Sequence, residues 1–420
     1  MKKRIFSATM AILMIMSSCV GCAKMGNDLI AGQDCFADNS VSLSCNDVGY
    51  KARYMDFVFG SMKKCCEVNK DQNVMISPAS VLFAMSMVES GAGGDTLDEM
   101  GSVMVPGSSG PEALGFAVDY YDTLSDNGDQ CLEIANGLFI NKDSRSKIYE
   151  SYIDYVEYSF DADIDSFSFD KSGVDKINKW AEDKTEGMIP SIMDDLDPNE
   201  VSVLVNAIAF DANWAIPYRE NDIFENMTFT NSQGVEEKVT MLNGNQGVYY
   251  ETDKAMGFVK NYKKGFAFVA ILPKDKSISA NEFLATFDGN DYREFMSSGE
   301  NALVKTHIPE FSFDYTNDAF DSVLKDLGMN RVFSDQADLS NMSNSDLLIS
   351  RVMHKTHIEL DRTGTRAAAV TSASSMTSGG SIVMKEVSIF LDRPFVFMII
   401  ENETETPIFI GTVNSVNQAG

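Results

Sequence analysis

Two residue pairs in this chain have the types that hydrolysis or metal binding would use, Ser77 with His354 and His354 with His357. Serine and histidine could act as nucleophile and base, but a proline follows Ser77 and no acidic partner can be assigned. His354 and His357 are three residues apart in strand-like sequence, so they would point to opposite faces. The chain also lacks a G-x-S-x-G elbow, an H-E-x-x-H motif, a P-loop and a CxxC…CxxC pattern. We therefore predict no enzyme, no metal site and no cofactor.

One stretch, Asp361 to Pro394, organises the rest of the sequence (DRTGTRAAAVTSASSMTSGGSIVMKEVSIFLDRP). It has no proline between Gly364 and Arg393, so every backbone N–H in that interval could join a β-ladder. Three interpretations compete: a helix start at Ala367–Ala369, a flexible linker over Ser372–Ser381, and a mobile loop that can enter a β-sheet. Gly364 would give such a loop its backbone pivot.

Period-two spacing favours the mobile strand. One face would carry small residues throughout: Thr365, Ala367, Ala369, Thr371 and Ala373. This face could enter between existing strands without overpacking a core. The opposite face would hold Arg366, Ala368, Val370, Ser372 and Ser374, and there the charge of Arg366 could stay in solvent.

The composition is that of a globular protein with a strong acidic excess. The 420 residues are 44% hydrophobic and 23% charged, and 34 basic against 62 acidic side chains give a formal charge of −28. This charge disfavours nucleic acid and anionic membrane surfaces as partners. The length allows one large domain or two ordinary ones.

The N-terminus predicts export. Lys2, Lys3 and Arg4 precede an apolar run from Ile5 to Met16, which is typical of a secretory signal. Cys19 or Cys22 then follows small residues, in a pattern that resembles a bacterial lipoprotein cleavage site. We expect a signal peptide over residues 1–22 and a flexible tether over 23–52. The protein would be an outer-surface or periplasm-facing lipoprotein, with ordinary secretion as the alternative, and would meet a membrane only through its lipid anchor.

Five cysteines remain after the signal, an odd number that argues against a complete disulfide framework. Cys35 and Cys45 could pair within the tether. The sequence leaves that pairing open.

Helices are expected early and strands late, which indicates a mixed α+β fold. Helical spacing is seen over Tyr54–Val68, over Val81–Val88 after Ser77-Pro78, around Ile177–Trp180 and over Ala319–Leu327. Strands are expected at Leu132–Asn141, Val201–Ile208, Phe266–Leu272, Lys305–Ile308, Leu348–Met353, Val387–Phe390, Phe395–Ile400 and Ile408–Val413.

Several motifs, in order and at similar spacing, resemble the serpin family from about Tyr54 to Asn414. Asn73 with Ser77-Pro78-x-Ser80 is similar to the family's N-x-x-x-S-P-x-S, and Val205–Ile208 with Asn213-Trp214 to its VNAIYF…NW. Pro309-Glu310-Phe311 stands where the family has P-K-F. The others are Leu327-Gly328-Met329, Ala337-Asp338-Leu339-Ser340, His354-Lys355, Asp392-Arg393-Pro394-Phe395 and Ile410-Gly411.

This resemblance implies one serpin-like domain over residues 53–417, with a large central mixed β-sheet, smaller sheets, flanking helices and an exposed reactive loop at about 361–386. It also implies a monomer that inhibits serine proteases by suicide: the protease cuts the loop, forms a covalent complex, and is trapped when the loop inserts into the sheet. The hinge residues carried over are Gly364, Thr365, Arg366, Ala367, Ala368, Ala369, Val370 and Thr371. Ser77, Ser80, Asn206 and His354 would form the polar cluster where the sheet opens, and Trp214 would sit at the top of that opening.

Two positions depart from the family pattern. Family hinges commonly carry an acidic residue two before the glycine and a glutamate two after it, where this chain has Arg362 and Arg366. We expect Arg362 to lose a salt bridge near the hinge and Arg366 to be tolerated on the outward face.

The scissile bond is not fixed by the sequence. Counting forward from Gly364 places it near Ser378–Gly379, and counting back from Pro394 places it near Ile382–Val383. Met376, Thr377 and Ser378 suit elastase-, chymotrypsin- or subtilisin-like enzymes, and trypsin-like targets would need Lys385. The alternatives are a non-inhibitory serpin used as a surface binding module and an inhibitor of papain-like cysteine proteases.

Overall fold

A computed structural model describes residues 44–127, 131–345, 347–349, 352–365 and 385–418. All of them belong to one compact unit, Asn39–Gly420. In this part of the chain no helix is long and apolar enough to cross a membrane. Nor do these residues bring together three or more His, Cys, Asp or Glu side chains that could hold a metal ion.

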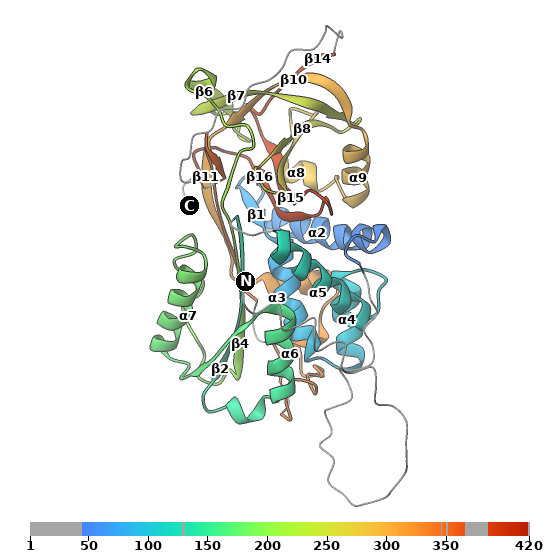
Figure 1. The fold of residues 1–420 in the computed structure, drawn as a ribbon, viewed down its shortest axis with the longest axis vertical. Helices are drawn as coiled ribbons and strands as arrows, with labels where there is room; N and C mark the ends of the chain where they lie inside the picture. The colour runs from blue at the N-terminus through green and yellow to red at the C-terminus, as the bar shows by residue number, and fades with distance from the viewer. Residues whose placement is uncertain (1–43, 128–130, 346, 350–351, 366–384, 419–420) are drawn as a thin grey trace, which may run out of the picture. The chain divides into compact units, whose positions relative to one another are not determined.

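Helices dominate the first third of the described chain (Figure 1). Their starts follow local capping chemistry: Asp47 and Asp170 accept hydrogen bonds from first-turn N–H groups, and Ser77 caps a helix whose first residue is Pro78. The helices are α2 (Val48–Val68), α3 (Pro78–Ser90), α4 (Gly94–Met104), α5 (Gly110–Asn127), α6 (Glu150–Phe160) and α7 (Lys171–Lys184). Later come α8 (Ala280–Leu284), α9 (Gly289–Ser297), α10 (Phe320–Asp326) and 3₁₀ turns at Arg145–Lys147, Glu220–Asp222 and Arg331–Phe333.

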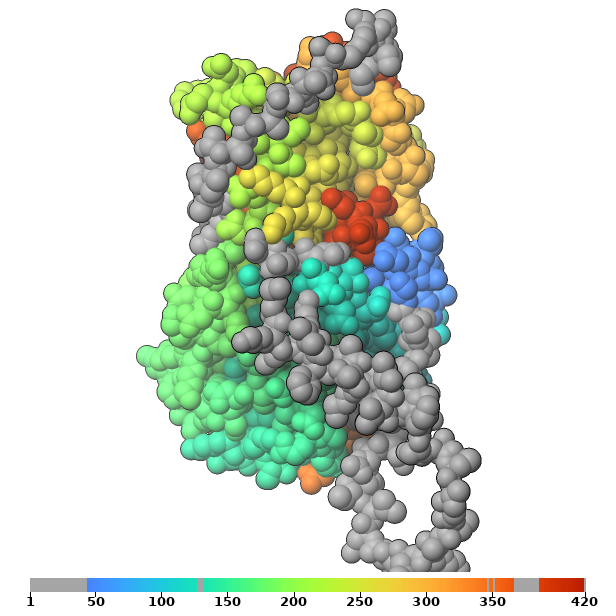
Figure 2. Space-filling model, viewed as in Figure 1, coloured from blue at the N-terminus to red at the C-terminus, as the bar shows by residue number. Residues whose placement is uncertain are grey.

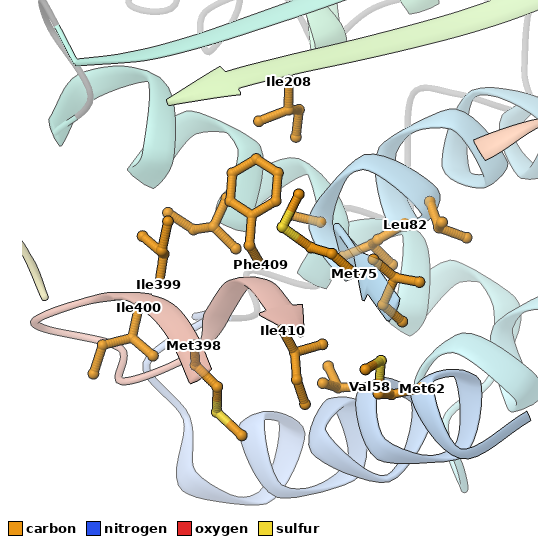
Figure 3. Close-up of a cluster of buried hydrophobic side chains, with 14 of the residues drawn as sticks. Val58, Met62, Met75, Leu82, Ile208, Met398, Ile399, Ile400, Phe409 and Ile410 are labelled. Atoms are coloured by element: carbon orange, nitrogen blue, oxygen red, sulfur yellow. The ribbon is translucent and has the colours of Figure 1, made fainter. Parts of the chain in front are cut away.

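The largest sheet holds the core. Its strand order is β1 (Val74–Ile76), β16 (Pro407–Val413), β15 (Phe395–Glu401), β9 (Phe266–Pro273), β8 (Ala255–Asn261), β7 (Glu236–Glu251), β10 (Glu300–Pro309) and β14 (Glu386–Phe390), with β6 (Ile223–Thr230) also paired to β7. Strands β9, β15 and β16 are buried along their whole length, which explains their near-continuous apolar sequence. Figure 3 shows Val58 and Met62 of α2 near Ile410 of β16, and Met75 of β1 near Phe409.

Two smaller sheets lie on either side of a gap. One has the order β3 (Asp163–Phe167), β2 (Leu132–Asn141), β4 (Ser202–Phe210); the other has β11 (Phe311–Asn317), β12 (His354–Leu360), β13 (Gly364–Thr365), β5 (Ala212–Asn213). Strand β5 follows β4 after the single residue Asp211, so β4 and β5 form one nearly continuous strand that belongs to both sheets. Among the described residues no ladder joins β4 to β12, so a gap separates these strands below β13.

Figure 2 shows how chain order is distributed over the surface. The α6–α7 region covers one end of the compact unit, and the β6–β10 region covers the other. Strand β4, which borders the gap, lies in the half that contains α3, α6 and α7 (Figure 1).

Most elements expected from the sequence are confirmed, including the mixed α+β class. Strand β2 matches its predicted bounds, and β9, β14, β15 and β16 differ by a residue at one or both ends. The strand expected at Leu348–Met353 is wrong: the described residues there are irregular, and β12 begins only at His354. The end of the expected tether, Val48–Ala52, is helical because Asp47 caps α2. Helices α8 and α9 were missed, although both begin with a capping box.

Candidate functional site

The upper end of the gap is closed by two hinge residues. Gly364 pairs with Asn213, and Thr365 pairs with Ala212 on one side and Leu360 on the other. A Cβ atom on Gly364 would lie 2.0 Å from the carbonyl oxygen of Ala212, so only glycine allows this close approach. The chain therefore starts a strand between β5 and β12 and has completed two residues of it.

A tight turn directs the chain back between the two strands. The Oδ1 atom of Asp361 accepts hydrogen bonds from Thr363 N (2.7 Å) and Gly364 N (3.1 Å). The Asp361 N–H donates to the carbonyl oxygen of Gly364 at 2.9 Å. An aspartate that bonds the backbone two residues ahead is a typical turn-forming device, so the turn is built into the sequence D-R-T-G.

Two stacked aromatic side chains, those of Trp214 and Tyr262, contact the turn and the hinge. Trp214 donates its indole N–H to Asp361 O and its backbone N–H to Thr363 O, both at 3.0 Å. Its ring stacks on Tyr262, with centroids 4.4 Å apart and planes at 9°. The Tyr262 hydroxyl lies 2.6 Å from Thr365 Oγ1, and burial raises the pKa of Tyr262 well above its usual value. Trp214 was expected here; Tyr262 was not.

A buried lysine completes this stack. The Nζ atom of Lys260 lies over the rings of Trp214 (5.0 Å) and Tyr218 (4.4 Å) and donates to the carbonyl oxygen of Ile216 at 3.1 Å. Burial lowers the pKa of Lys260 to about 8. Sequence reasoning missed this residue because a single lysine in an apolar strand carries no pattern of its own.

Arg362 was expected to lose a salt bridge, and that expectation is wrong. Its Nε and Nη2 atoms bond the two carboxylate oxygens of Glu310 at 3.0 and 3.2 Å. Glu310 stands where the family's P-K-F motif has lysine, so both charges are exchanged and the attraction is kept. The Glu310 carboxylate also raises the pKa of Arg362.

The lower end of the gap is a cavity of about 350 Å³. Its walls come from α3, from β4 and from the irregular segment that precedes β12. The lining includes Ser80, Val81, Ala84, Met85 and Val88 of α3, residues 201–206, Leu339, Met342, Leu347–Ile349 and Val352–His354. The run that looked like a strand thus forms one wall of the cavity.

Three of the four predicted polar residues, Ser80, Asn206 and His354, line this cavity. The fourth, Ser77, joins Ser80 and His354 in one hydrogen-bonded chain. Ser77 donates its N–H to His354 Nε2 at 2.9 Å, and Ser80 donates its N–H to Ser77 Oγ at 3.2 Å. Burial lowers the pKa of His354 to about 4, so the ring is neutral at neutral pH and Nε2 acts as acceptor.

Asn206 lines the same cavity but bonds a different partner. Its Nδ2 atom donates to Asn136 Oδ1 at 2.6 Å, and Asn136 in turn donates to the carbonyl oxygen of Phe160. The Oδ1 atom of Asn206 is buried and has no hydrogen-bond partner among the described residues. An unpaired buried amide oxygen costs roughly 1–3 kcal/mol. The lower end of the gap therefore holds a buried amide oxygen without a partner among the described residues.

Several predicted site residues lie outside the described part of the chain. They are the hinge positions Arg366, Ala367, Ala368, Ala369, Val370 and Thr371, the scissile-bond candidates Met376, Thr377, Ser378, Gly379, Ile382 and Val383, and the lipidation candidates Cys19 and Cys22. Cys35 does too; Cys45 is buried as a free thiol 3.3 Å from Thr123 Oγ1.

Comparison with known proteins identifies the architecture. A family model described as serpin (serine protease inhibitor) matches residues 52–416. This chain belongs to the serpin family. Neuroserpin of Gallus gallus is 29% identical over 363 residues and covers 82% of this serpin and 86% of its own length. A serpin-like protein of Thermococcus kodakarensis is 30% identical over 363 residues, with 84% and 83% coverage.

Solved serpin structures show the same fold. The native state of tengpin, a thermophilic serpin, aligns with a TM-score of 0.77 and 35% identity over 88% of this chain and 95% of tengpin. Thyroxine-binding globulin in complex with thyroxine aligns with a TM-score of 0.75 at 24% identity, which supports the fold alone. Serpins are typically protease inhibitors rather than enzymes, but the family also includes members that do not inhibit.

Proposed function

We propose that this serpin is a suicide inhibitor of serine endopeptidases of the elastase, chymotrypsin or subtilisin type. One observation carries the proposal: Gly364 and Thr365 already lie between β5 and β12, and an unfilled cavity lies further along the same gap. A strand that has been started needs no new nucleation, so its extension can be fast. Speed decides the outcome because insertion competes with deacylation.

The reaction begins as ordinary proteolysis. The protease serine Oγ attacks a loop carbonyl, the protease histidine takes the proton, and the peptide bond breaks as the new amino terminus leaves. The ester then links protease to loop. Insertion of the cut loop would move the protease away from its bound position and distort its oxyanion hole. The loss of one oxyanion-hole donor slows acyl transfer about 10²–10³-fold, so the ester would outlive the encounter.

The inserting residues supply the driving force. The small side chains of Ala367, Ala369, Thr371 and Ala373 would face inward. The backbone of the inserted strand would add a row of hydrogen bonds to its two neighbouring strands. The strand would also cover the cavity and give the buried Asn206 Oδ1 a possible donor. Scissile-bond candidates from Met376 to Val383 are uncharged and small or medium in size, which favours proteases with small or medium apolar specificity pockets.

Mixing the purified protein with elastase-, chymotrypsin-, subtilisin-, trypsin- and papain-type proteases tests the proposal. We expect a covalent band on a denaturing gel with one of the first three, and mass spectrometry should place the cut between Met376 and Met384. The same protease with its active-site serine replaced by alanine is the control and should give no band. Clean cleavage with no complex and no gain in thermal stability would reject inhibition. A stable adduct with the papain-type enzyme alone would reassign the target class.

We also propose that the protein acts outside the cytoplasm, anchored by a lipid on Cys19 or Cys22. The signal-like residues 2–16 followed by these cysteines support this proposal. Metabolic labelling with a fatty acid should mark the wild-type protein, and the Cys19→Ser or the Cys22→Ser variant should lose the label. Recovery of an unprocessed, unlabelled chain from the cytoplasm would contradict the proposal.

A further inference from the structure

Three aromatic side chains form an exposed row on the largest sheet, and no part of the reaction described above uses them. His307 of β10 stacks on Phe390 of β14, with ring centroids 3.9 Å apart and planes at 14°. Phe224 of β6 meets the same histidine edge-on at 6.1 Å. Phe224 and Phe390 are 39% and 37% exposed. We call these three residues the aromatic strip.

The surroundings of the strip resemble the anatomy of a binding surface. Leu303, 38% exposed, lies four residues before His307 on β10. The nearby charges are paired, Lys305 with Glu386 and Lys385 with Glu300. Burial lowers the pKa of His307, so its ring is neutral at neutral pH. An aromatic centre within a polar rim is the arrangement that supplies most of the binding energy in protein interfaces.

The position of the strip points to its occupant. Strand β14 begins at Glu386, directly after the loop that carries the scissile-bond candidates, and Figure 1 shows β6, β7, β10 and β14 together at one end of the sheet. Phe390 is seven residues after Val383, at most about 25 Å along an extended chain. A protease domain of about 230 residues is roughly 45 Å across. A protease whose cleft holds the loop can therefore reach the strip.

The charge of the molecule restricts the chemistry of that protease. The chain carries a formal charge of −28, which attracts cationic proteins and repels acidic ones. The faces of aromatic rings bind ammonium and guanidinium groups. An arginine or lysine beside the protease cleft could lie over Phe390 or Phe224 and would meet no unpaired positive charge among the residues named above.

We propose that the aromatic strip is a second docking surface for the target protease and that it selects proteases with a cationic rim beside the active-site cleft. The loop then sets which peptide bond is cut, and the strip sets which protease arrives. This inference rests on the proposed function in its choice of partner, but it concerns the first, non-covalent encounter.

The encounter is measured with an inactive protease, so that trapping plays no part. The probes are a cationic elastase-type protease and an acidic protease of the same cleft class, each with its active-site serine replaced by alanine. The Phe224→Ala/Phe390→Ala double variant should bind the cationic protease at least tenfold more weakly. The matched control is Val235→Ala, which truncates an exposed residue in the β6–β7 turn away from the strip and should change Kd less than twofold.

A second variant guards against loss of folding. Phe224→Lys keeps a long side chain at an exposed position and places a cation on the strip, so it should also weaken binding of the cationic protease tenfold or more. Thermal unfolding within 2 °C of wild type is required for both variants. The acidic protease should bind weakly and show no dependence on the strip.

Failure of this inference is distinguishable from failure of the proposed function. Equal Kd values for wild type and both folded variants would reject the aromatic strip as a docking surface, even where covalent complexes form. A tenfold loss with the acidic protease as well overturns the selection of a cationic rim. Strip-dependent binding without any covalent complex supports the docking surface and rejects suicide inhibition.

Discussion

The two ends of the gap between β4–β5 and β12 are built in opposite ways. At the upper end, Gly364 and Thr365 complete the ladder on both sides, and Trp214 and Tyr262 bond the turn and the hinge. At the lower end, a cavity of about 350 Å³ separates the strands, and a buried oxygen of Asn206 lacks a partner. Both ends lie along the place that one additional strand would occupy between β4–β5 and β12. The fold thus begins a strand at the upper end and leaves the lower end of the same position unfilled.

We call the upper end of the gap the closed end and the lower end the open end. A charge at the closed end should have the largest effect on trapping. Thr365 is buried, and Thr365→Arg would place an unpaired guanidinium between β5 and β12, at a cost of several kcal/mol. We expect the arginine to hold the hinge out of the sheet in the uncut variant, so that insertion must bury the charge. Trapping should then fall at least about 100-fold, because each ~1.4 kcal/mol slows a step tenfold. Denaturing gels should then show cut protein in place of the complex.

Glu359→Arg is the matched control for that variant. Glu359 is exposed on β12, so the same charge would remain in water and complex formation should be unchanged. Equal inhibition by Thr365→Arg and wild type would show that trapping does not need Thr365 to be seated between β5 and β12.

The second-largest effect is expected from acid, which should lower the free energy of unfolding through His354 at the open end. The pKa of His354 is lowered from its usual 6.5 to about 4 by burial, so the folded state favours the neutral ring. The stability from this group is present above pH 6.5 and is lost as the pH falls from 6.5 through 4, by at most about 1.4 kcal/mol per pH unit. Urea unfolding of wild type and His354→Asn at pH 7, 6, 5 and 4 should show a steeper decline for wild type.

Glu89 is a second buried group whose titration affects the pH dependence of unfolding in that measurement. Its pKa is raised well above the usual value by burial on α3, so its contribution has the opposite sign and stability falls as the pH rises. Because Glu89 is present in both proteins, it cancels in the difference between them. Parallel pH profiles would mean that His354 is solvated in the folded protein.

Filling the open end should make it resemble the closed one. Ala84 of α3 lines the cavity, and Ala84→Leu would fill part of it. We expect the uncut protein to gain about 1 kcal/mol in stability. Insertion, which would cover a smaller cavity in this variant, should slow about fivefold. Thermal unfolding and the rate of complex formation measure the two effects.

The control for cavity filling is Ala285→Leu, at an exposed position after α8. It adds the same atoms in solvent and should change neither quantity. A faster insertion in Ala84→Leu would show that the cavity opposes insertion rather than favouring it.

The smallest effect is expected at the Arg362–Glu310 pair above the closed end. These side chains are 43% and 21% exposed, and such pairs contribute about 0–1 kcal/mol. Arg362→Glu should lower thermal stability slightly, and Arg362→Glu/Glu310→Arg should restore it. A double variant no better than the single one would mean that the pair contributes no net attraction.

Sequence patterns predicted the closed end better than the open one. The turn D-R-T-G, the glycine pivot and Trp214 are local signals, and each acts as its chemistry suggests. The apolar run Leu348–Met353 has the composition of a strand, but its described residues line a cavity because no neighbouring strand pairs with them.

Partners that are distant in the sequence were the main source of error. Residues 310 and 362 are joined by an ion pair that charge exchange conceals, since each residue alone looks like a departure from the family. The bond from Asn206 to Asn136 and the stack of Lys260 on Trp214 likewise depend on tertiary contacts. Sequence alone gives the types of these residues and not their neighbours.

The exchanged charges of Arg362 and Glu310 have a consequence for mixtures of related proteins. A hinge of the ordinary family type, with an acidic residue at the position of Arg362, would meet the carboxylate of Glu310 if it entered this protein's sheet. The hinge of this protein would likewise meet a lysine in an ordinary relative. Repulsion in both directions would make each sheet slightly more compatible with its own loop than with that of a neighbour, by about 0–1 kcal/mol. Where several such inhibitors share one compartment, this preference would slightly disfavour mixed assemblies.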